Sequence, residues 1–118
     1  MTTLELLRGA RNLLRAKKRW AQHYYAFDAQ HKQVDCASPD AVCFCAFGAL
    51  LRVGKWGDAY VALGVLGEAN NISNTIVYND APERTHAEIL AAFNKAIKFA
   101  LAEEKENARL ARESAVRS

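Results

Sequence analysis

The sequence predicts a small, single, all-α domain with about four helices, arranged orthogonally or as a bundle around one buried central helix. The chain has 118 residues, of which 51% are hydrophobic, with only 6 glycines and 2 prolines. That is enough for one core, and it is too apolar for a disordered chain. Several segments repeat apolar residues at helical spacing. One run from Ala41 to Leu51 has no polar side chain at all.

Residues 3–27 are expected to form one long amphipathic helix. At about 100° per residue, its apolar residues share one broad side; they are Leu6, Leu7, Ala10, Leu13, Leu14, Trp20, Ala21, Tyr24 and Phe27. The other side carries a basic stripe within an arc of about 100°, made of Arg8, Arg11, Arg15, Lys18 and Arg19. Lys17 projects from the apolar side, where it must snorkel or lie at a helix–helix margin.

Residues 28–37 lack periodicity and predict a loop. The central helix is expected over residues 39–53, because Ser38 offers an N-cap, Pro39 suits the first helical position and Gly54 suits the C-terminal stop. A helix that is apolar on all sides is a buried one. Its small residues, among them Cys45 and Gly48, mark the side that a neighbouring backbone can approach closely.

A third helix is expected from Trp56–Asp58 to Asn70–Asn71. Residues 72–78 are rich in β-branched side chains and predict an extended or short strand-like connection. A turn over residues 79–83 follows, and Thr85 with Glu88 then fits a capping box. The last helix carries Ile89, Leu90, Phe93, Ala96, Ile97 and Leu101 on one side. We expect residues 1–104 to form the domain and residues 105–118 to form a charged, fraying helix end or tail.

Charge and cysteine content favour a cytoplasmic protein. The net charge is +3, with +5 in residues 1–22, −4 in residues 23–94 and +2 in residues 95–118. The three cysteines, Cys36, Cys43 and Cys45, are an odd number, which argues against a secreted disulfide framework. No secretory signal and no apolar run of about 18 residues is present, so we expect no membrane association.

The cysteines predict core packing rather than a metal site. Cys43 and Cys45 would project about 200° apart on a helix, so one zinc ion cannot bind both, and the spacing matches no zinc signature. We expect no metal and no cofactor. The enzymatic alternative is a small hydrolase or transferase in which Cys43 is the nucleophile, His86 is the base and Asp80 or Asn79 orients the imidazole.

The turn before the last helix is the densest polar cluster, formed by Asn79, Asp80, Glu83, Arg84, Thr85 and His86. It can be interpreted as a ligand or partner site at a helix N-terminus, where backbone N–H groups bind anions, or as a structural turn, which we favour. The basic stripe offers a second alternative, the binding of nucleic-acid phosphates.

Two stretches resemble a known family. They are residues 40–50 and residues 78–97, with Tyr78-Asn79-Asp80 and Arg84-Thr85-His86 as the more specific part. Together with the region around Trp20 they resemble a small bacterial and phage family, domain of unknown function 6197, over about residues 5–100. The resemblance implies a cytoplasmic bacterial or phage setting and no activity, cofactor or catalytic residue. The family pattern has Trp where this chain has Phe44 and Tyr78, and an aromatic residue is retained at both.

The favoured hypothesis is a non-enzymatic interaction or regulatory module that binds a protein partner. Its expected working surfaces are the basic stripe and the turn over residues 79–86. A Cys–His enzyme and a nucleic-acid backbone binder are the alternatives. Self-association of the chain, with the charged tail as one route, also stays open.

Overall fold

The computed structural model describes residues 1–117 and is mainly helical, as the sequence predicts. Its α-helices are α1 (Thr3–Leu13), α2 (Ala46–Val53), α3 (Trp56–Asn70), α4 (Thr75–Asp80) and α5 (His86–Arg117). A 3₁₀ turn, η1 (Lys17–Arg19), and two short strands, β1 (Ala26–Phe27) and β2 (Cys43–Phe44), complete the order of elements.

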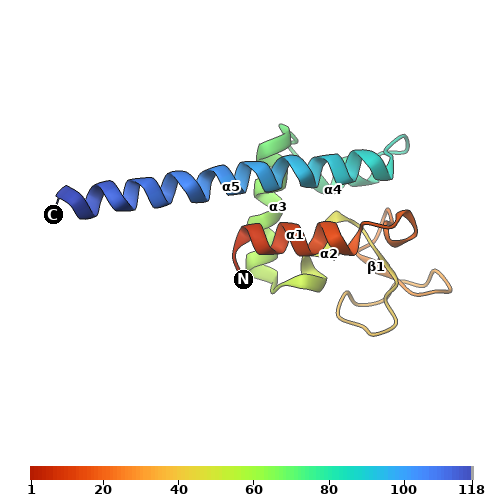
Figure 1. The fold of residues 1–118 in the computed structure, drawn as a ribbon. Helices are drawn as coiled ribbons and strands as arrows, with labels where there is room; N and C mark the ends of the chain where they lie inside the picture. The colour runs from red at the N-terminus through yellow and green to blue at the C-terminus, as the bar shows by residue number, and fades with distance from the viewer. Residues whose placement is uncertain (118) are drawn as a thin grey trace.

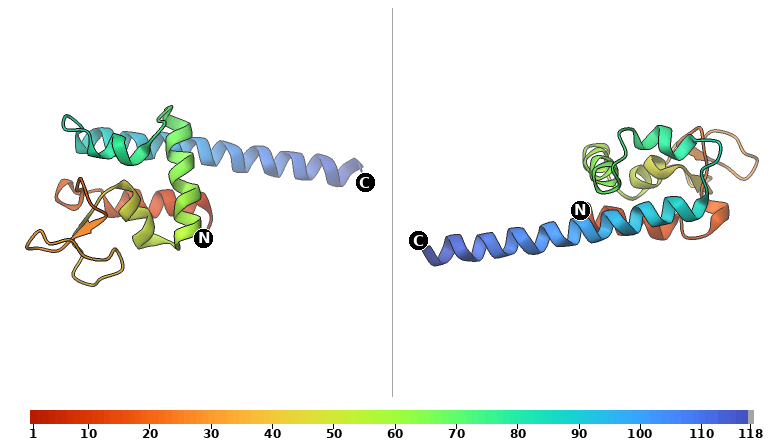
Figure 2. Two further views of the ribbon diagram at one scale, coloured as in Figure 1. Left: turned by 180° about the vertical axis from the view of Figure 1, so that it is seen from behind. Right: turned by 90° about the horizontal axis from the view of Figure 1, so that it is seen from above.

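The helices pack in two directions (Figure 1). α1 and α5 run antiparallel, and α3 crosses them steeply, which is also clear from behind in Figure 2. α2 lies between α1 and α3, and α4 packs beside it. The loops around the two strands gather at the end of the molecule opposite the C-terminus. The arrangement is orthogonal rather than a parallel bundle.

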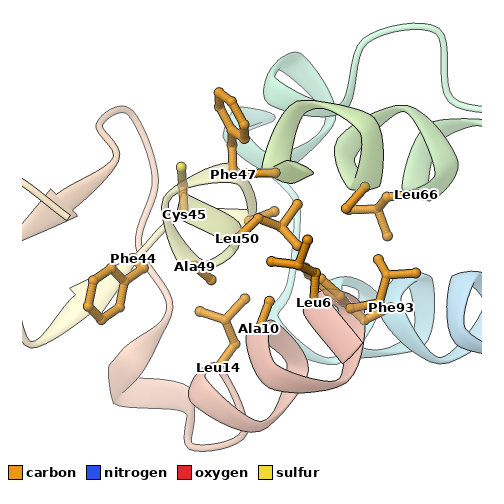
Figure 3. Close-up of a cluster of buried hydrophobic side chains, with 14 of the residues drawn as sticks. Leu6, Ala10, Leu14, Phe44, Cys45, Phe47, Ala49, Leu50, Leu66 and Phe93 are labelled. Atoms are coloured by element: carbon orange, nitrogen blue, oxygen red, sulfur yellow. The ribbon is translucent and has the colours of Figure 1, made fainter. Parts of the chain in front are cut away.

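The core lies where α1, α2, α3 and α5 meet (Figure 3). Leu6 and Ala10 of α1, Leu50 of α2, Leu66 of α3 and Phe93 of α5 converge there, and all are at most 1% exposed. Each fully buried leucine or phenylalanine among them contributes about 1.5–3 kcal/mol of hydrophobic stabilisation. The predicted buried central helix is therefore present, with α2 in that role.

The first helix is shorter than predicted. The expected helix over residues 3–27 ends at Leu13, and Leu14 is its C-cap. Arg15 and Ala16 lead into η1, and residues 26–27 form β1 instead of helix. Nothing local breaks the helix here, since no glycine or proline lies between residues 10 and 27. The chain is redirected instead by contacts with distant residues, such as that of Trp20 with Asn79.

The central helix begins at residue 46, not at residue 39 as predicted. Ser38 caps only a turn, in which its Oγ accepts from the N–H of Asp40 at 3.1 Å. Residues 43–44 are taken into β2, and Cys45 becomes the N-cap, with its Sγ accepting from the N–H of Gly48 at 3.2 Å. The predicted stop at Gly54 is confirmed.

The two strands do not form in residues 72–78, the segment whose β-branched side chains predict extended structure. β1 and β2 pair antiparallel, with Ala26 opposite Phe44 and Phe27 opposite Cys43. The predicted extended connection over residues 72–78 is wrong beyond residue 74. Asn74 caps α4 there, and its Oδ1 accepts from the N–H of Val77 at 3.1 Å.

The third and last helices match their predictions closely. α3 begins at Trp56, and Asn71 ends it in a left-handed conformation with φ 55°. The capping box before α5 is present, with the N–H of Thr85 donating to Glu88 at 2.9 Å and that of Glu88 donating back at 3.2 Å. From residue 102 to residue 116 α5 is exposed. No helix within residues 1–117 combines the length and the apolar character needed to cross a membrane.

Gly48 allows α2 to lie directly on the backbone of residue 25. A Cβ placed on Gly48 would sit 1.9 Å from the carbonyl oxygen of Tyr25. The N–H of Cys45 donates to that same oxygen at 3.2 Å. The predicted small-residue side of the central helix thus does contact a neighbouring backbone.

We predict that Gly48→Ala destabilises the domain by about 3 kcal/mol, because the methyl group would overlap backbone that cannot move aside. Gly64→Ala is the matched control: a Cβ there meets nothing within 4 Å, and α3 should gain about 0.5–1 kcal/mol. Urea unfolding of both variants measures the difference. Equal stabilities would contradict the close approach at Gly48.

Candidate functional site

Asn79 lies in α4 and not in the predicted turn over residues 79–83, which begins only after Asp80. Its buried side chain joins three segments of the chain, namely residues 20–21, α2 and α4 itself. Its side chain is 1% exposed. Its Oδ1 accepts from the indole N–H of Trp20 at 2.9 Å and from the backbone N–H of Ala46 at 3.1 Å. Its Nδ2 donates to the carbonyl of Ala21 at 3.1 Å and to Asp80 Oδ1 at 2.9 Å. All four hydrogen-bonding positions of the amide are therefore used.

The segment after Trp20 closes the end of α4. Gln22 Nε2 donates to the carbonyls of Asn79 and Ala81, each at 2.9 Å. The backbone N–H of His23 donates to Asp80 Oδ1 at 2.9 Å, with His23 in a left-handed conformation of φ 78°. The last carbonyls of a helix have no hydrogen-bond donor within the helix. At the end of α4, the side chain of Gln22 is that donor. These contacts account for the end of α1: residues 20–23 must leave the helix to reach α4.

The other polar side chains of this cluster, between α4 and the start of α5, also contact groups of the protein itself. Arg84 donates from Nε to the carbonyl of Tyr78 at 2.9 Å, lies 3.5 Å over its ring and pairs with Glu88 at 2.9 Å. Hydrogen bonds from Thr85 lower the pKa of the Glu88 carboxyl. His86 Nε2 donates to the carbonyl of Leu14 at 2.6 Å, which satisfies the C-terminus of α1. Asn79, Asp80, Arg84, Thr85 and His86 are brought together, and their contacts favour the structural interpretation.

The three residues of the enzymatic alternative do not converge on one cavity. Cys43 lines a hollow of about 430 Å³, the Lys18–His31 hollow, together with Trp20. His86 lines a different one of about 360 Å³, the Lys17–His86 hollow, which Trp20 also borders. The Asp80 carboxylate accepts hydrogen bonds from the backbone N–H of His23 and from the Asn79 side chain. Within residues 1–117, no hydrogen bond among Cys43, His86 and Asp80 supports a nucleophile, base and orienting acid.

The cysteines are free, buried thiols. Burial raises the pKa of all three above the ordinary value, and it raises the pKa of Cys45 to about 11. A raised pKa keeps the group as the less nucleophilic thiol at neutral pH. Within the described part of the chain, no group of three or more His, Cys, Asp or Glu residues is arranged to hold a metal ion.

The five cations of the predicted basic stripe do not share one helical face. Arg8 and Arg11 lie on α1, and Arg11 Nε donates to Asn94 Oδ1 of α5. Arg15, Lys18 and Arg19 lie beyond the end of α1, in and around η1, where Lys17 is exposed beside them. The stripe as predicted is therefore wrong, because its geometry required helix through residue 19.

An apolar surface that the sequence analysis did not single out lies on α3. Trp56, Tyr60 and Val61 are 60%, 64% and 57% exposed. At 100° per residue they share an arc of about 140° with Gly57, Gly64 and Glu68; we call this arc the α3 face. The opposite side of α3 buries Ala59, Ala62 and Leu66 in the core. The sequence does show that α3 has large apolar residues on more than one side, although only one side is covered.

Two hollows flank the α3 face. Trp56 borders one of about 390 Å³, the Tyr24–Trp56 hollow, which Tyr25 and Leu51 also line. Tyr60 borders another of about 350 Å³, the Tyr60–Ile76 hollow, at the junction of α3 and α4. The Trp56 ring packs edge-on against Phe47, with centroids 5.3 Å apart. The exposed rings of Trp56 and Tyr60 thus each border a hollow.

A comparison with protein families matches residues 1–99 to a model described as "Family of unknown function (DUF6197)". The match ends within α5, so the exposed last part of that helix lies outside it. Comparisons with curated proteins and with solved structures found no match.

We predict that Asn79→Ala destabilises the domain by about 3 kcal/mol, because it leaves the Trp20 indole, the Ala46 amide and the Ala21 carbonyl without a buried partner. Asn74→Ala removes an exposed N-cap contact instead and should cost about 1 kcal/mol. Guanidinium unfolding monitored by circular dichroism compares the two. A smaller loss for the Asn79 variant would show that Asn79 does not organise the turn.

We also predict slow alkylation of the native thiols. Raising the pKa of Cys45 from 9.0 to about 11 makes its thiolate roughly 100-fold scarcer at pH 8, and burial restricts access further. Site-resolved mass spectrometry after iodoacetamide treatment measures each rate, with the unfolded chain as the reference. Native Cys43 reacting as fast as in the unfolded chain would revive the enzymatic alternative.

Proposed function

The chain belongs to the Family of unknown function (DUF6197), which supplies no activity, and we propose from its own surface that it is a binding module whose α3 face receives an amphipathic helix of a partner protein. The observation that carries the proposal is the exposure of Trp56, Tyr60 and Val61 on two successive turns of one helix. Contiguous exposed apolar patches of this kind are typical of interaction sites.

The side chains of the α3 face suit a protein partner. Trp and Tyr are enriched among the residues that dominate binding energy at protein interfaces. Burying one such side chain contributes about 1.5–3 kcal/mol. The Trp56 ring already packs against Phe47, which lowers the rotamer entropy that this side chain loses on binding.

The shape of the α3 face favours a helix as the partner segment. Gly57 and Gly64 lie on the arc between the large side chains, and a Cβ at either position meets nothing within 4 Å. A second helix can pack over these two glycines, and its side chains can enter the Tyr24–Trp56 and Tyr60–Ile76 hollows. Helices that dock this way present apolar residues at i, i+3, i+4 and i+7.

The partner's charge is constrained as well. Glu68 is the ionised residue on the α3 face, and it makes no ion pair in the described part of the chain. The partner helix is therefore proposed to be apolar on its contact side, with a basic residue toward the C-terminal end of α3. The three free thiols favour a cytoplasmic setting, which is part of the proposal. A bacterial or phage origin, which the resemblance noted above implies, is part of it as well.

Site-specific photo-crosslinking tests the proposal. Benzoylphenylalanine at position 60, in cells that naturally express the chain, should give an adduct with one partner protein. The same group at position 110, on exposed α5, should not. The adducted peptide should map to an amphipathic helix of the partner, and that peptide should bind the purified chain.

Val61→Asp should abolish this adduct and weaken peptide binding at least about tenfold, because it places a charge in the apolar contact. Val116→Asp is the matched control: the residue is 86% exposed on α5, and its substitution should leave binding unchanged. Equal adducts at positions 60 and 110, no adduct, or an adduct with a second copy of the chain would each contradict the proposal.

A further inference from the structure

A second surface, independent of the α3 face, carries an unbalanced positive charge. Arg15, Lys17, Lys18 and Arg19 are all exposed and lie within five residues; we call them the cationic turn. None of the four side chains makes an ion pair or hydrogen bond in the described part of the chain. The turn lies at the end of the molecule opposite the C-terminus (Figure 1).

The cationic turn is held at both ends. Before it, the carbonyl of Leu14 accepts from His86 Nε2 at 2.6 Å. After it, the Trp20 indole donates to the buried Asn79 at 2.9 Å. The cations are therefore displayed from a fixed backbone, and little backbone entropy is lost when they bind a ligand.

Two hollows adjoin the cationic turn, and Trp20 borders both. Lys18 lines the Lys18–His31 hollow and Lys17 lines the Lys17–His86 hollow. Among residues 1–117, no carboxylate lines either one. Since the four cations make no ion pair in the described part of the chain, their positive charge should attract an anionic ligand to these hollows.

The Lys18–His31 hollow also offers an aromatic surface. His31 lies flat on the Phe27 ring, with centroids 4.2 Å apart and planes 1° from parallel, and it is exposed. A flat exposed ring beside a row of cations is the combination that binds single-stranded nucleic acids, in which phosphates follow the charges and bases stack on rings. Duplex DNA would instead need a helix or ribbon for its major groove, and η1 has only three residues.

We propose that the cationic turn and the Lys18–His31 hollow bind single-stranded nucleic acid, with phosphates on the four cations and a base stacked on His31. This surface lies on η1 and the strand loops, and α3 contributes nothing to it. Binding is expected to depend on charge and stacking and to show little sequence preference.

Fluorescence anisotropy with a labelled 15-nucleotide oligo(dT) tests the proposal on the full chain. Binding should be measurable at 50 mM salt and should weaken with a log–log slope of about −2.8, as expected for four phosphate contacts. Lys17→Glu with Lys18→Glu should bind at least about tenfold more weakly and halve that slope to about −1.4. Both side chains are exposed, so the variant should fold normally by circular dichroism.

Lys95→Glu with Lys98→Glu is the matched control, because it changes the net charge equally at exposed positions of α5 and should leave binding within about twofold. His31→Asn keeps a residue that tolerates the left-handed φ of 64° and should weaken binding about fivefold without changing the salt slope. Equal losses in the two lysine variants, equal binding of a 15-base-pair duplex, or no binding at 50 mM salt would each overturn the proposal.

Discussion

The structure depends on one buried amide. Asn79 hydrogen-bonds to residues 20 and 21, to the first residue of α2 and to its own neighbour in α4. An amide left unpaired in this core would be strongly destabilising, so all three segments must come together for any one of them to be stable. The requirement explains why a sequence with helical periodicity through residue 27 leaves the helix at residue 13. It also explains why α2 begins at residue 46, where Asn79 caps its N-terminus together with Cys45.

Elements whose ends are specified locally could be predicted from the sequence. The capping box of Thr85 and Glu88, the stop at Gly54 and the left-handed Asn71 each involve residues within one turn of the helix end. The end of α1 and the pairing of β1 with β2 involve partners that are far apart in sequence, such as Trp20 and Asn79. The hydrophobic periodicity of one sequence reflects contacts between residues that are close in the chain, not contacts with distant partners. Predictions from periodicity therefore made the first and central helices too long.

For the candidate sites too, the sequence shows which residues are neighbours in the chain, but not which distant groups they contact. The polar turn is recognisable as a cluster in the sequence, but only the structure shows that its side chains are already bonded to Tyr78, Leu14 and the end of α4. The basic stripe is misplaced because it assumes helix through residue 19, although the cations themselves gather in the cationic turn. The α3 face was not predicted, because an apolar helix is usually interpreted as buried. The sequence shows that α3 has apolar residues on all sides, but it does not show which side is left uncovered within the described chain.

Hydrogen exchange of the two tryptophan indoles, followed by NMR, tests the central role of Asn79 most directly. Trp20 donates to Asn79, whereas Trp56 is 60% exposed and its indole makes no hydrogen bond in the described chain, so one molecule holds both the probe and its reference. The Trp20 indole should exchange only at the rate of global unfolding, and the Trp56 indole should exchange as in a free peptide. Rapid exchange of both would show that the Trp20–Asn79 contact is not maintained, and Asn79 could not then be the residue that holds the three segments together.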